Sequence, residues 1–299
     1  MSITAIILTF NESIHLERCI LSIKRVADRI LVVDSFSQDD TKEIALKNSL
    51  EYYEHVFVNH SEQLKWALSL LDENTEWVLR IDADEYLTDD LVNEIRAKIP
   101  QVEKHIKGIY IPRSIVFQGR LIKHGGVYSK LIIRLFRFGY ANVDNRWMDE
   151  HILVNGKTMD FKNQLIDNNL QPLTWWINKH NSYSSKEAFQ IFNDKYNVYA
   201  NDEKSKEIHR QNNYYSYKLK RKIYSSIPFQ FRSIIYFFYR YFILLGFLDG
   251  AEGFAFHFLQ AFWYRYLVDL KYNEISKLSK KTNLCKLELI QDVLKIKIK

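Results

Sequence analysis

The stretch EWVLRIDADE, from Glu76 to Glu85, decides the fold of this chain. Its first six residues form a largely apolar run, typical of a strand buried on both faces of a sheet. Asp82 and Asp84 follow at a spacing of two, so in an extended segment both carboxylates point to the same side. Two hard oxygen donors at a strand's carboxyl end suit Mg²⁺ or Mn²⁺ bound between protein and phosphate. The alternative is a loop whose acids only cap the helix beginning near Thr88.

Strand and helix patterns alternate on both sides of this stretch. The predicted strands before it are Ile3–Thr9, Arg29–Asp34 and Glu51–Val58. Helices are predicted after Asn11, which can cap the first of them, and over residues 39–50, 62–71 and beyond Thr88. Such a βαβ series predicts a doubly wound sheet whose ligand lies beyond the carboxyl ends of the strands.

The second half of the chain has a different pattern. Strands are predicted over residues 108–117, 130–138 and 151–160 without full helices between them, and from Trp175 onward the pattern is helical. We therefore expect a mixed sheet over residues 1–220, of which the first part is a doubly wound, Rossmann-like nucleotide half. A basic and aromatic helical region over residues 221–299 follows, with a soft boundary between 170 and 225.

Length and composition exclude several classes of protein. The 299 residues are 47% hydrophobic and 26% charged, which excludes a fully disordered chain. The two cysteines, Cys19 and Cys285, cannot build a disulfide framework or a CxxC zinc site, and Cys19 is predicted to be buried and inert. The N-terminus lacks a basic region before its short apolar run, so it does not resemble a signal peptide. These features predict a cytoplasmic protein.

Positive charge and aromatic residues are concentrated near the C-terminus. Residues 204–240 contain nine Lys and Arg and one acid, so their net charge is +8, whereas the net charge of the whole chain is +6. The most apolar part, Ser233–Leu248, is 16 residues long and contains Arg240, whereas a membrane span needs about 20 largely uncharged residues. We therefore expect helices that lie on an anionic membrane surface, on the inner face of the cytoplasmic membrane, and no nucleic-acid partner. The alternative is a buried helical pair in a soluble domain.

Several common catalytic motifs are missing from the sequence. The turn after the first strand is TFNES, which is neither the GxGxxG of a dinucleotide site nor a GxxxxGK[ST] phosphate loop. HExxH and GxSxG are also missing, which argues against the usual zinc proteases and α/β hydrolases. The remaining interpretation is an α/β nucleotide site that handles phosphate through a metal.

Taken together, these motifs resemble the family 2 glycosyltransferases with a GT-A fold, in particular the bacterial lipopolysaccharide core (WaaE-type) branch. The matching segments, spread over residues 3–272, are IILTFNE (6–12), LVVDSFSQDDT (31–41), SEQLKWAL (61–68), WVLRIDADE (77–85), HGGVYSKLIIRLFR (124–137), DEHI (149–152), KHNSYSSKEA (179–188) and LLGFLDGAEGF (244–254). The resemblance implies an inverting, metal-dependent transferase that uses a nucleotide sugar, most often a UDP-sugar. It also implies a role in building a surface glycan such as lipopolysaccharide or capsule.

The resemblance assigns roles to residues on the donor side. It places Thr9, Glu12 and Asp34 at the base and ribose of the nucleotide and Lys65 near it. Asp82 and Asp84 would bridge ribose, diphosphate and metal, and His180 is a further candidate for diphosphate or metal. His180 also has a plain structural interpretation on an aromatic helix face. The sequence departs from the family at Phe36, where glycine is usual, and the added side chain narrows the nucleotide loop.

The resemblance also assigns roles on the acceptor side. Glu150 matches the catalytic base of inverting enzymes, with Asp149 as the alternative. His124, Gly125 and Gly126 would form a loop close to the sugar, or only a tight turn between strands. Trp147 would stack on a sugar face, or pack in the core. The acceptor would be a glycan or a lipid-linked glycan.

Two other functions fit part of the pattern. A sugar-phosphate nucleotidyltransferase also uses an α/β fold with acids that bind metal, but it carries a Gly- and Arg-rich loop where this chain has TFNES. A membrane-peripheral scaffold for glycan assembly could retain the fold without activity. The presence of both the DADE acids and Glu150 argues against such a degenerate protein.

Overall fold

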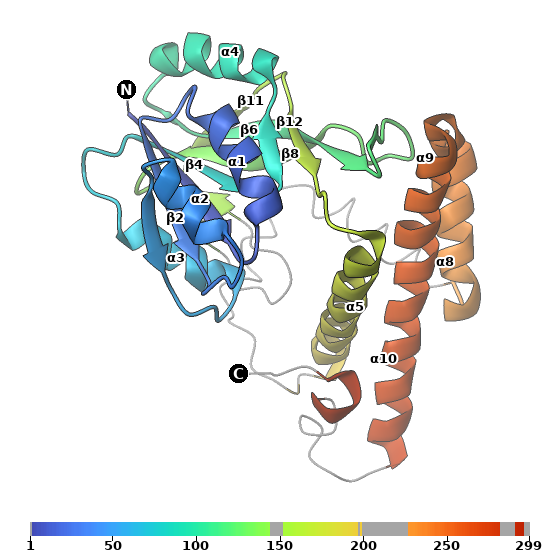
Figure 1. Cartoon of the computed structure of the whole chain (residues 1–299). Coiled ribbons are helices and arrows are strands. Elements are labelled where there is room, and N and C mark those ends of the chain that lie inside the picture. Colours follow the sequence, from blue (N-terminus) through green and yellow to red (C-terminus); the bar gives the residue numbers. More distant parts are fainter. Residues whose placement is uncertain (1, 144–151, 197, 199–226, 282–290, 296–299) are drawn as a thin grey trace. The chain divides into compact units, whose positions relative to one another are not determined.

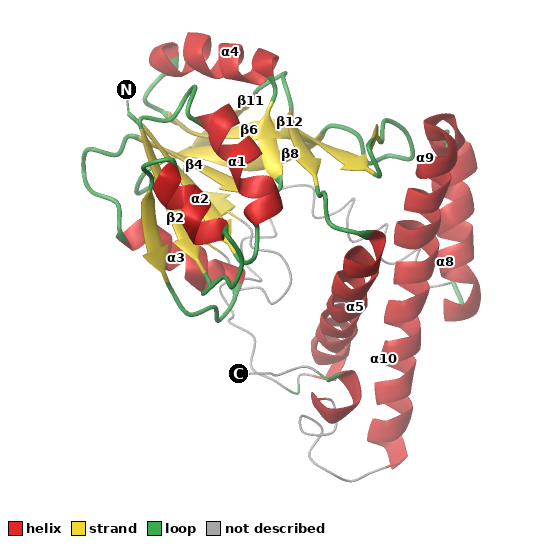
Figure 2. Cartoon of the chain, viewed as in Figure 1, coloured by secondary structure: helices red, strands yellow, loops and turns green. Residues whose placement is uncertain are grey.

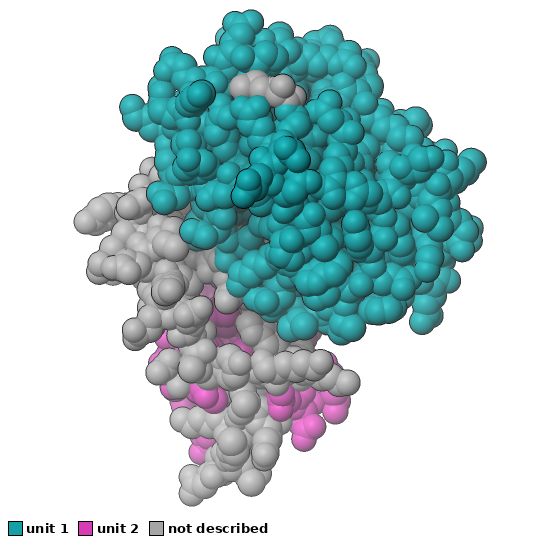
Figure 3. All heavy atoms as spheres, turned by 90° about the vertical axis from the view of Figure 1, so that its left-hand side faces the viewer, with its two compact units in different colours: residues 1–123, 127–144, 150–170 teal, residues 124–126, 145–149, 171–299 magenta. Residues whose placement is uncertain are grey.

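The computed structural model describes residues 2–143, 152–196, 198, 227–281 and 291–295, and Figure 1 shows their elements in chain order. The chain divides into two compact units, coloured separately in Figure 3. Unit 1 comprises residues 1–123, 127–144 and 150–170, and unit 2 comprises residues 124–126, 145–149 and 171–299.

Unit 1 contains the described strands and helices α1 to α4 (Figure 2). Its elements are β1 (Ile3–Thr9), α1 (Ser13–Ile23), β2 (Arg29–Asp34), α2 (Thr41–Lys47), β3 (Glu51–Glu54), α3 (His60–Ser69), β4 (Trp77–Asp82), β5 (Glu85–Leu87), α4 (Asp89–Lys98), a 3₁₀ turn (Ile99–Gln101), β6 (Ile106–Phe117), β7 (Arg120–Leu121), β8 (Lys130–Arg137), β9 (Ala141–Val143), β10 (Ile152–Val154), β11 (Lys157–Asp160) and β12 (Leu165–Asn168).

Ten of the described strands form one large mixed sheet, and β9 and β10 pair antiparallel in a separate two-stranded sheet. Within the described residues the order of the large sheet is β3-β2-β1-β4-β8-β6-β12-β5, with β7 and β11 also paired to β6. The first four strands are parallel, and β8 runs antiparallel to both β4 and β6. The prediction of a mixed α/β sheet whose first part is built from βαβ units is therefore confirmed.

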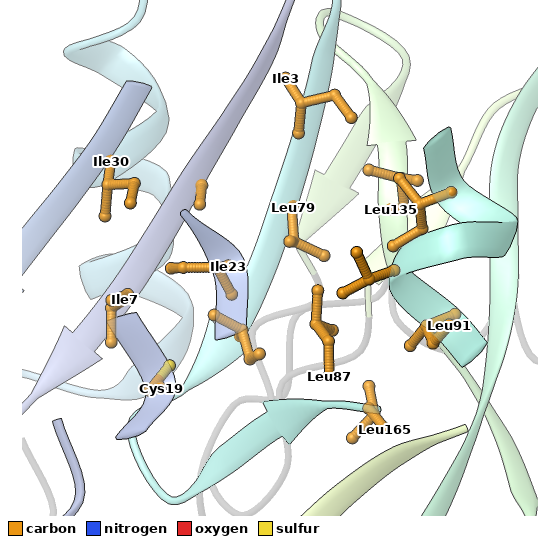
Figure 4. Close-up of a cluster of buried hydrophobic side chains, with 14 of the residues drawn as sticks. Ile3, Ile7, Cys19, Ile23, Ile30, Leu79, Leu87, Leu91, Leu135 and Leu165 are labelled. Atoms are coloured by element: carbon orange, nitrogen blue, oxygen red, sulfur yellow. The ribbon is translucent and has the colours of Figure 1, made fainter. Parts of the chain in front are cut away.

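Side chains that alternate along β1 make two cores, one on each face of the sheet. Ile3, Ala5 and Ile7 pack with α1 and α4, whereas Ile6 packs with α3. Figure 4 shows the larger cluster, in which Cys19 of α1 lies beside Ile7. Cys19 is fully buried, and burial raises the pKa of its thiol, so the prediction of a buried cysteine is confirmed.

Several predicted elements have other bounds in the structure. The strand predicted over residues 151–160 is divided into β10 and β11, and the helix predicted over residues 39–50 is the shorter α2. The strand predicted over Glu51–Val58 ends at Glu54, which pairs with Asp34, the last residue of β2. Asn11 does not cap α1: Glu12 occupies the N-cap position, and the Asn11 side chain instead accepts a hydrogen bond from the Gln38 backbone at 2.8 Å. The prediction that Thr88 caps the next helix is confirmed, since its hydroxyl accepts from the Leu91 backbone.

Unit 2 is helical in its described residues. Its elements are α5 (Leu173–Tyr196), α8 (Phe229–Phe238), a π-helical turn (Tyr239–Ile243), a 3₁₀ turn (Gly246–Asp249), α9 (Gly250–His257), a second π-helical turn (Phe258–Trp263) and α10 (Tyr264–Lys281). Helices α5 and α10 pack through Ala188, Phe192, Val268 and Ile275, which are buried. The predicted C-terminal helical region is confirmed.

Candidate functional site

Three of the predicted donor-site residues end neighbouring parallel strands. Thr9 is the last residue of β1 and pairs in register with Asp34, the last residue of β2. Asp82 ends β4 and pairs with Leu8, next to Thr9. The carboxyl edge of the sheet therefore brings Thr9, Asp34 and Asp82 together, as the order of strands and acids predicted.

Asp34 holds the loop that follows β2. Its carboxylate is fully buried and accepts hydrogen bonds from the Thr9 hydroxyl at 2.8 Å and from the Ser37 hydroxyl and backbone at 2.5 and 2.6 Å. Burial, together with the Asp34 carboxylate, raises the pKa of the neighbouring Tyr52. Asp34 thus shapes the loop beside the predicted nucleotide site, and its direct contact with ribose stays a prediction.

Phe36 adopts a backbone conformation that favours glycine. Its φ angle is +62°, in the left-handed region that costs a residue with a Cβ about 1–2 kcal/mol. The ring is 50% exposed, and Ser37 next to it accepts a hydrogen bond from the Asn11 backbone at 2.7 Å. The hydrogen bonds of Asp34 and Ser37 therefore hold an aromatic ring at the surface in a strained backbone conformation.

Asp82 lies between two guanidinium groups. Its Oδ2 is 2.5 Å from Arg80 Nη1 and 2.7 Å from Arg134 Nη2, and both arginines are buried. Burial opposes ionisation, but Arg80 and Arg134 hold the pKa of Asp82 well below its ordinary value. Arg134 also bonds Glu85 at 2.6 Å, a residue that is 1% exposed and whose pKa is raised by burial. The strand tip is thus a network of alternating charge.

Asp84 lies at the end of β12. Its Oδ2 accepts a hydrogen bond from the Asn169 side chain at 3.0 Å, and its backbone carbonyl accepts from the Asn168 backbone at 3.0 Å and from Arg18 at 3.2 Å. Arg18 donates to the Asn168 carbonyl as well, at 2.6 Å. The turn that carries Asp84 is therefore fixed to β12 through backbone atoms, while its carboxylate is only partly buried.

Asp167 also belongs to this cluster, although no sequence motif points to it. This residue pairs with Glu85 between β12 and β5, and its carboxylate lies 3.6 Å from Arg113. Burial, followed by repulsion from Asp84, raises the pKa of Asp167 to about 8. A single acid in a short strand carries no local signal, and only the long-range pairing of β12 with β5 brings it to the DADE turn.

The fit of a divalent metal rests on few protein oxygens. In the described part of the chain, no group of three or more His, Cys, Asp and Glu is arranged to hold a metal ion. The guanidinium groups of Arg80 and Arg134 both contact the Oδ2 atom of Asp82. The Asp84 carboxylate is partly exposed and bonds the Asn169 side chain. Mg²⁺ sites commonly combine one or two carboxylates with phosphate oxygens and water. Such a site, completed by a diphosphate, fits these residues.

Glu12 is paired with His15, a residue that no sequence motif indicated. Glu12 Oε2 lies 2.5 Å from Nδ1 of His15, and the His15 Nε2 accepts a hydrogen bond from the Leu170 backbone at 2.8 Å. Because Nε2 accepts, the proton of a neutral imidazole lies on Nδ1 and is donated to Glu12. The i, i+3 spacing of Glu12 and His15 could have signalled this pair.

Lys65, the predicted residue near the nucleotide, lies on α3 and bonds Glu62 at 2.9 Å.

The loop predicted to approach the sugar belongs to unit 2. The backbone and Nδ1 of His124 both bond the buried Asp249, each at 2.8 Å. The Gly125 backbone donates to the Leu244 carbonyl at 2.8 Å, and its own carbonyl accepts from Arg240 at 2.9 Å. Gly125 and Gly126 both have φ of +73°, so glycine suits the conformation of this turn.

His180 also lies in unit 2, on α5. Its Nδ1 donates to the Trp176 carbonyl at 2.9 Å, and its ring stacks on the Trp176 ring. Burial lowers the pKa of His180, so at neutral pH the imidazole is uncharged. These contacts match the structural interpretation, and a role toward metal or diphosphate stays a prediction.

The predicted acceptor-side residues Trp147, Asp149 and Glu150 lie outside the described residues. Their roles rest on the sequence alone.

Residues 4–147 match the sequence profile of the family described as "Glycosyl transferase family 2". A Rickettsia conorii protein described as an uncharacterized glycosyltransferase is 28% identical over 283 residues, which is 93% of this chain and 92% of that protein. A Rickettsia bellii protein with the same description is 27% identical, over 92% of this chain and 87% of its own length. These relatives match nearly the whole chain, including unit 2.

Solved structures match smaller parts. Glucosyl-3-phosphoglycerate synthase of Mycobacterium tuberculosis, solved with Mn²⁺ and UDP, aligns over 38% of this chain and 44% of its own, with a TM-score of 0.32 and 20% identity. S. aureus TarS aligns over 62% of this chain and 40% of its own, with a TM-score of 0.39 and 14% identity. This chain thus spans less than half of either protein. The profile match thus covers just under half of the chain, and residues 4–147, which include the acids at the strand ends, are similar to the family 2 glycosyltransferases.

Proposed function

We propose that this protein transfers a sugar from a nucleotide-diphosphate donor, a UDP-sugar, to a hydroxyl group of a bacterial surface glycan or lipid-linked glycan, with inversion at the anomeric carbon. The observation that carries the proposal is the cluster at the carboxyl edge of the sheet. There Thr9, Asp34 and Asp82 end neighbouring strands, and the Asp84 carboxylate is partly exposed beside them.

The electrostatics of this edge suit a diphosphate that leaves with negative charge. Glycosyl transfer develops positive charge on the sugar and negative charge on the departing group. Arg80 and Arg134 keep Asp82 ionised, so this residue is a carboxylate rather than a carboxylic acid at the strand end. A divalent ion held by Asp84 would supply Lewis-acid stabilisation of the leaving diphosphate, typically several kcal/mol.

The acceptor hydroxyl requires a base, because an alcohol is a poor nucleophile at neutral pH. A carboxylate within hydrogen-bond reach contributes roughly 10²–10⁴ in rate. We assign this role to Glu150, with Asp149 as the alternative, on the basis of the DEHI segment. His124 and the two glycines after it are assigned to the sugar side, and Trp147 to stacking on a sugar face.

Nucleotide binding by the purified full chain tests the donor half of the proposal. Calorimetric titration with UDP should show binding that is strengthened by Mn²⁺, and Asp84→Asn should remove most of the metal effect. Asp90→Asn is the matched control, because Asp90 is exposed in the first turn of α4. Equal metal dependence in both variants would remove Asp84 from the site. No nucleotide binding at all would favour the scaffold interpretation.

The rate of sugar transfer tests the part of the proposal that concerns the acceptor. In a screen of UDP-, GDP- and dTDP-sugars, Glu150→Gln should bind the donor as the wild type does and lose at least about 100-fold in transfer or donor hydrolysis. Glu103→Gln, a change at an exposed position, should leave both unchanged. Normal turnover by Glu150→Gln would shift the assignment to Asp149. Formation of a nucleotide sugar from sugar phosphate would identify a nucleotidyltransferase instead.

A further inference from the structure

The segment from Phe231 to Phe258 in unit 2 exposes an unusual amount of apolar surface. Twelve of its 28 residues are large hydrophobic side chains that are at least 38% exposed, with Ile243 at 70%. Those twelve are Phe231, Ile234, Ile235, Phe238, Tyr239, Phe242, Ile243, Leu245, Phe247, Leu248, Phe254 and Phe258. Apolar exposure of this density marks an interaction surface rather than ordinary surface variation.

Four polar side chains of the same segment are buried, whereas Arg232 and Glu252 are partly exposed. Ser233, Arg240, Asp249 and His257 are all at most 4% exposed. Arg240 bonds the Gly125 carbonyl and the Gln260 side chain, both at 2.9 Å, and Asp249 receives the two hydrogen bonds of His124. A helical element with charges inside and hydrocarbon outside is the inverse of a water-exposed helix. It is the arrangement expected where the surroundings are lipid.

A bilayer explains this surface better than a protein partner does. Protein interfaces carry about one hydrogen bond per 100–200 Å² and a polar rim. Between Ser233 and Leu248 the sole charged residue is Arg240, which is buried, so the outer face has no charged group to pair. The sequence just before it is strongly basic, which complements anionic headgroups.

The geometry indicates entry into one leaflet. No single described helix has both the length and the apolar composition needed to cross a membrane, but Phe229–Ile243 and Gly246–Lys280 satisfy the test as a pair bent by 73°. The first arm has 15 residues and is therefore about 22 Å long, less than the roughly 30 Å of a hydrocarbon core. Leu245, with a φ of +59°, lies at the bend between the arms.

We propose that residues 229–263 form a re-entrant element that inserts into one leaflet of an anionic bilayer and carries the loop His124–Gly126 at the membrane surface. The loop is fixed to the turn between the arms, since Gly125 bonds both Leu244 and Arg240. The membrane contact stands on the exposed surface alone. The consequence that this loop meets an acceptor held in the membrane rests on the proposed function.

Vesicle flotation of the full chain tests the contact. With vesicles of phosphatidylethanolamine and phosphatidylglycerol, the wild type should float, and a fraction that does not depend on salt should stay bound in 1 M salt, because the contact of residues 229–263 is apolar. The double variant Phe242→Glu/Ile243→Glu should lose at least tenfold in binding. Leu21→Glu/Leu46→Glu is the matched control, since these residues are similarly exposed on unit 1, and it should float normally.

Three results would overturn the proposal. The first is equal flotation of the two double variants, and the second is complete loss of wild-type binding in 1 M salt. The third is a wild-type dimer in size-exclusion chromatography that the Phe242→Glu/Ile243→Glu variant converts to a monomer, because a second copy would then cover this face. Manganese-dependent UDP binding should persist in that variant, so a failure of docking and a failure of the proposed function are distinguishable.

Cysteine labelling distinguishes insertion into one leaflet from crossing. In a Cys285→Ser background, Gln230→Cys and Lys280→Cys place thiols at exposed positions near the outer ends of the two arms. A membrane-impermeant maleimide added outside sealed vesicles should label both. Labelling of one thiol alone would mean that the bent pair crosses the bilayer.

Discussion

Arg134 is the residue on which the charge balance at the end of β4 depends. It bonds Asp82 and the almost fully buried Glu85. Removing one partner of a buried ion pair leaves an uncompensated charge, which typically costs 3–5 kcal/mol. Arg134→Met should therefore lower the free energy of unfolding by about 3 kcal/mol in a urea titration.

The matched control for this change is Arg25→Met. Arg25 pairs with Asp89, whose side chain is 83% exposed, and exposed ion pairs contribute at most about 1 kcal/mol. If Arg134→Met costs no more than Arg25→Met, the network around Glu85 does not stabilise the strand tip.

Glu94 of α4 ties down the loop before β12 and so helps to place Asp167. Its carboxylate, 4% exposed, accepts from the Lys98 ammonium at 2.6 Å and from the backbones of Lys162 and Asn163 at 3.1 and 2.8 Å. Burial acts in the opposite direction, but these donors hold the pKa of Glu94 below its ordinary value. The stability it contributes is present above the unfolded pKa of about 4.3 and is lost as the pH falls through the lower, folded pKa.

Glu94→Gln should lower the free energy of unfolding at pH 7 by about 1–3 kcal/mol, the typical cost of an impaired buried hydrogen-bond group. It should also flatten the loss of stability below pH 5, as measured by urea titrations between pH 3 and 7. Glu103→Gln, at a position 76% exposed, should change neither quantity. An unchanged acid limb in Glu94→Gln would contradict the assignment.

At the scale of elements, the sequence predicted what local pattern determines. The bounds of β1 and β2 match the apolar runs, and Thr9, Asp34 and Asp82 fall at the strand ends as expected. Antiparallel β8 between β4 and β6, and the contact of β12 with β5, depend on pairing between distant segments. Residues such as Asp167 and Arg134, which enter the site only through that pairing, could not be predicted from the local pattern.

The turn His124–Gly126 requires glycine at position 125, and this requirement can be tested by substitution. A Cβ added at Gly125 would overlap the imidazole of His257, which is fully buried, and the φ of +73° adds backbone strain. Gly125→Ala should therefore lower the free energy of unfolding by more than the roughly 1–2 kcal/mol expected from strain alone, as measured by urea titration. Gly119→Ala isolates the strain, because Gly119 has a φ of +80° and no atom within 4 Å of the added Cβ. Equal effects of the two changes would show that the packing of His257 against the turn is loose.

At the scale of the whole molecule, charge is distributed in a way that suits an anionic surface. Residues 204–240 carry a net charge of +8, so the rest of the chain sums to −2. The run KLKRK at 218–222 lies outside the described residues, and its contribution is argued from sequence alone. A basic residue near an anionic leaflet contributes on the order of 1 kcal/mol, and salt screens that attraction.

Replacing Lys218, Lys220, Arg221 and Lys222 by Gln should therefore weaken binding to phosphatidylglycerol vesicles by at least tenfold at low salt. Binding to zwitterionic vesicles should not change, because the apolar face of residues 229–263 is intact in this variant. A matched variant with four exposed basic residues of unit 1 replaced by Gln, Lys42, Lys47, Arg96 and Lys104, should bind as the wild type does. The basic run and the apolar face respond differently to salt. Between 0.05 and 0.5 M salt, the affinity of the wild type should fall to that of the 218–222 variant. The affinity of the variant itself should change little over this range. If the variant keeps the full affinity and salt dependence of the wild type, another basic surface supplies the attraction.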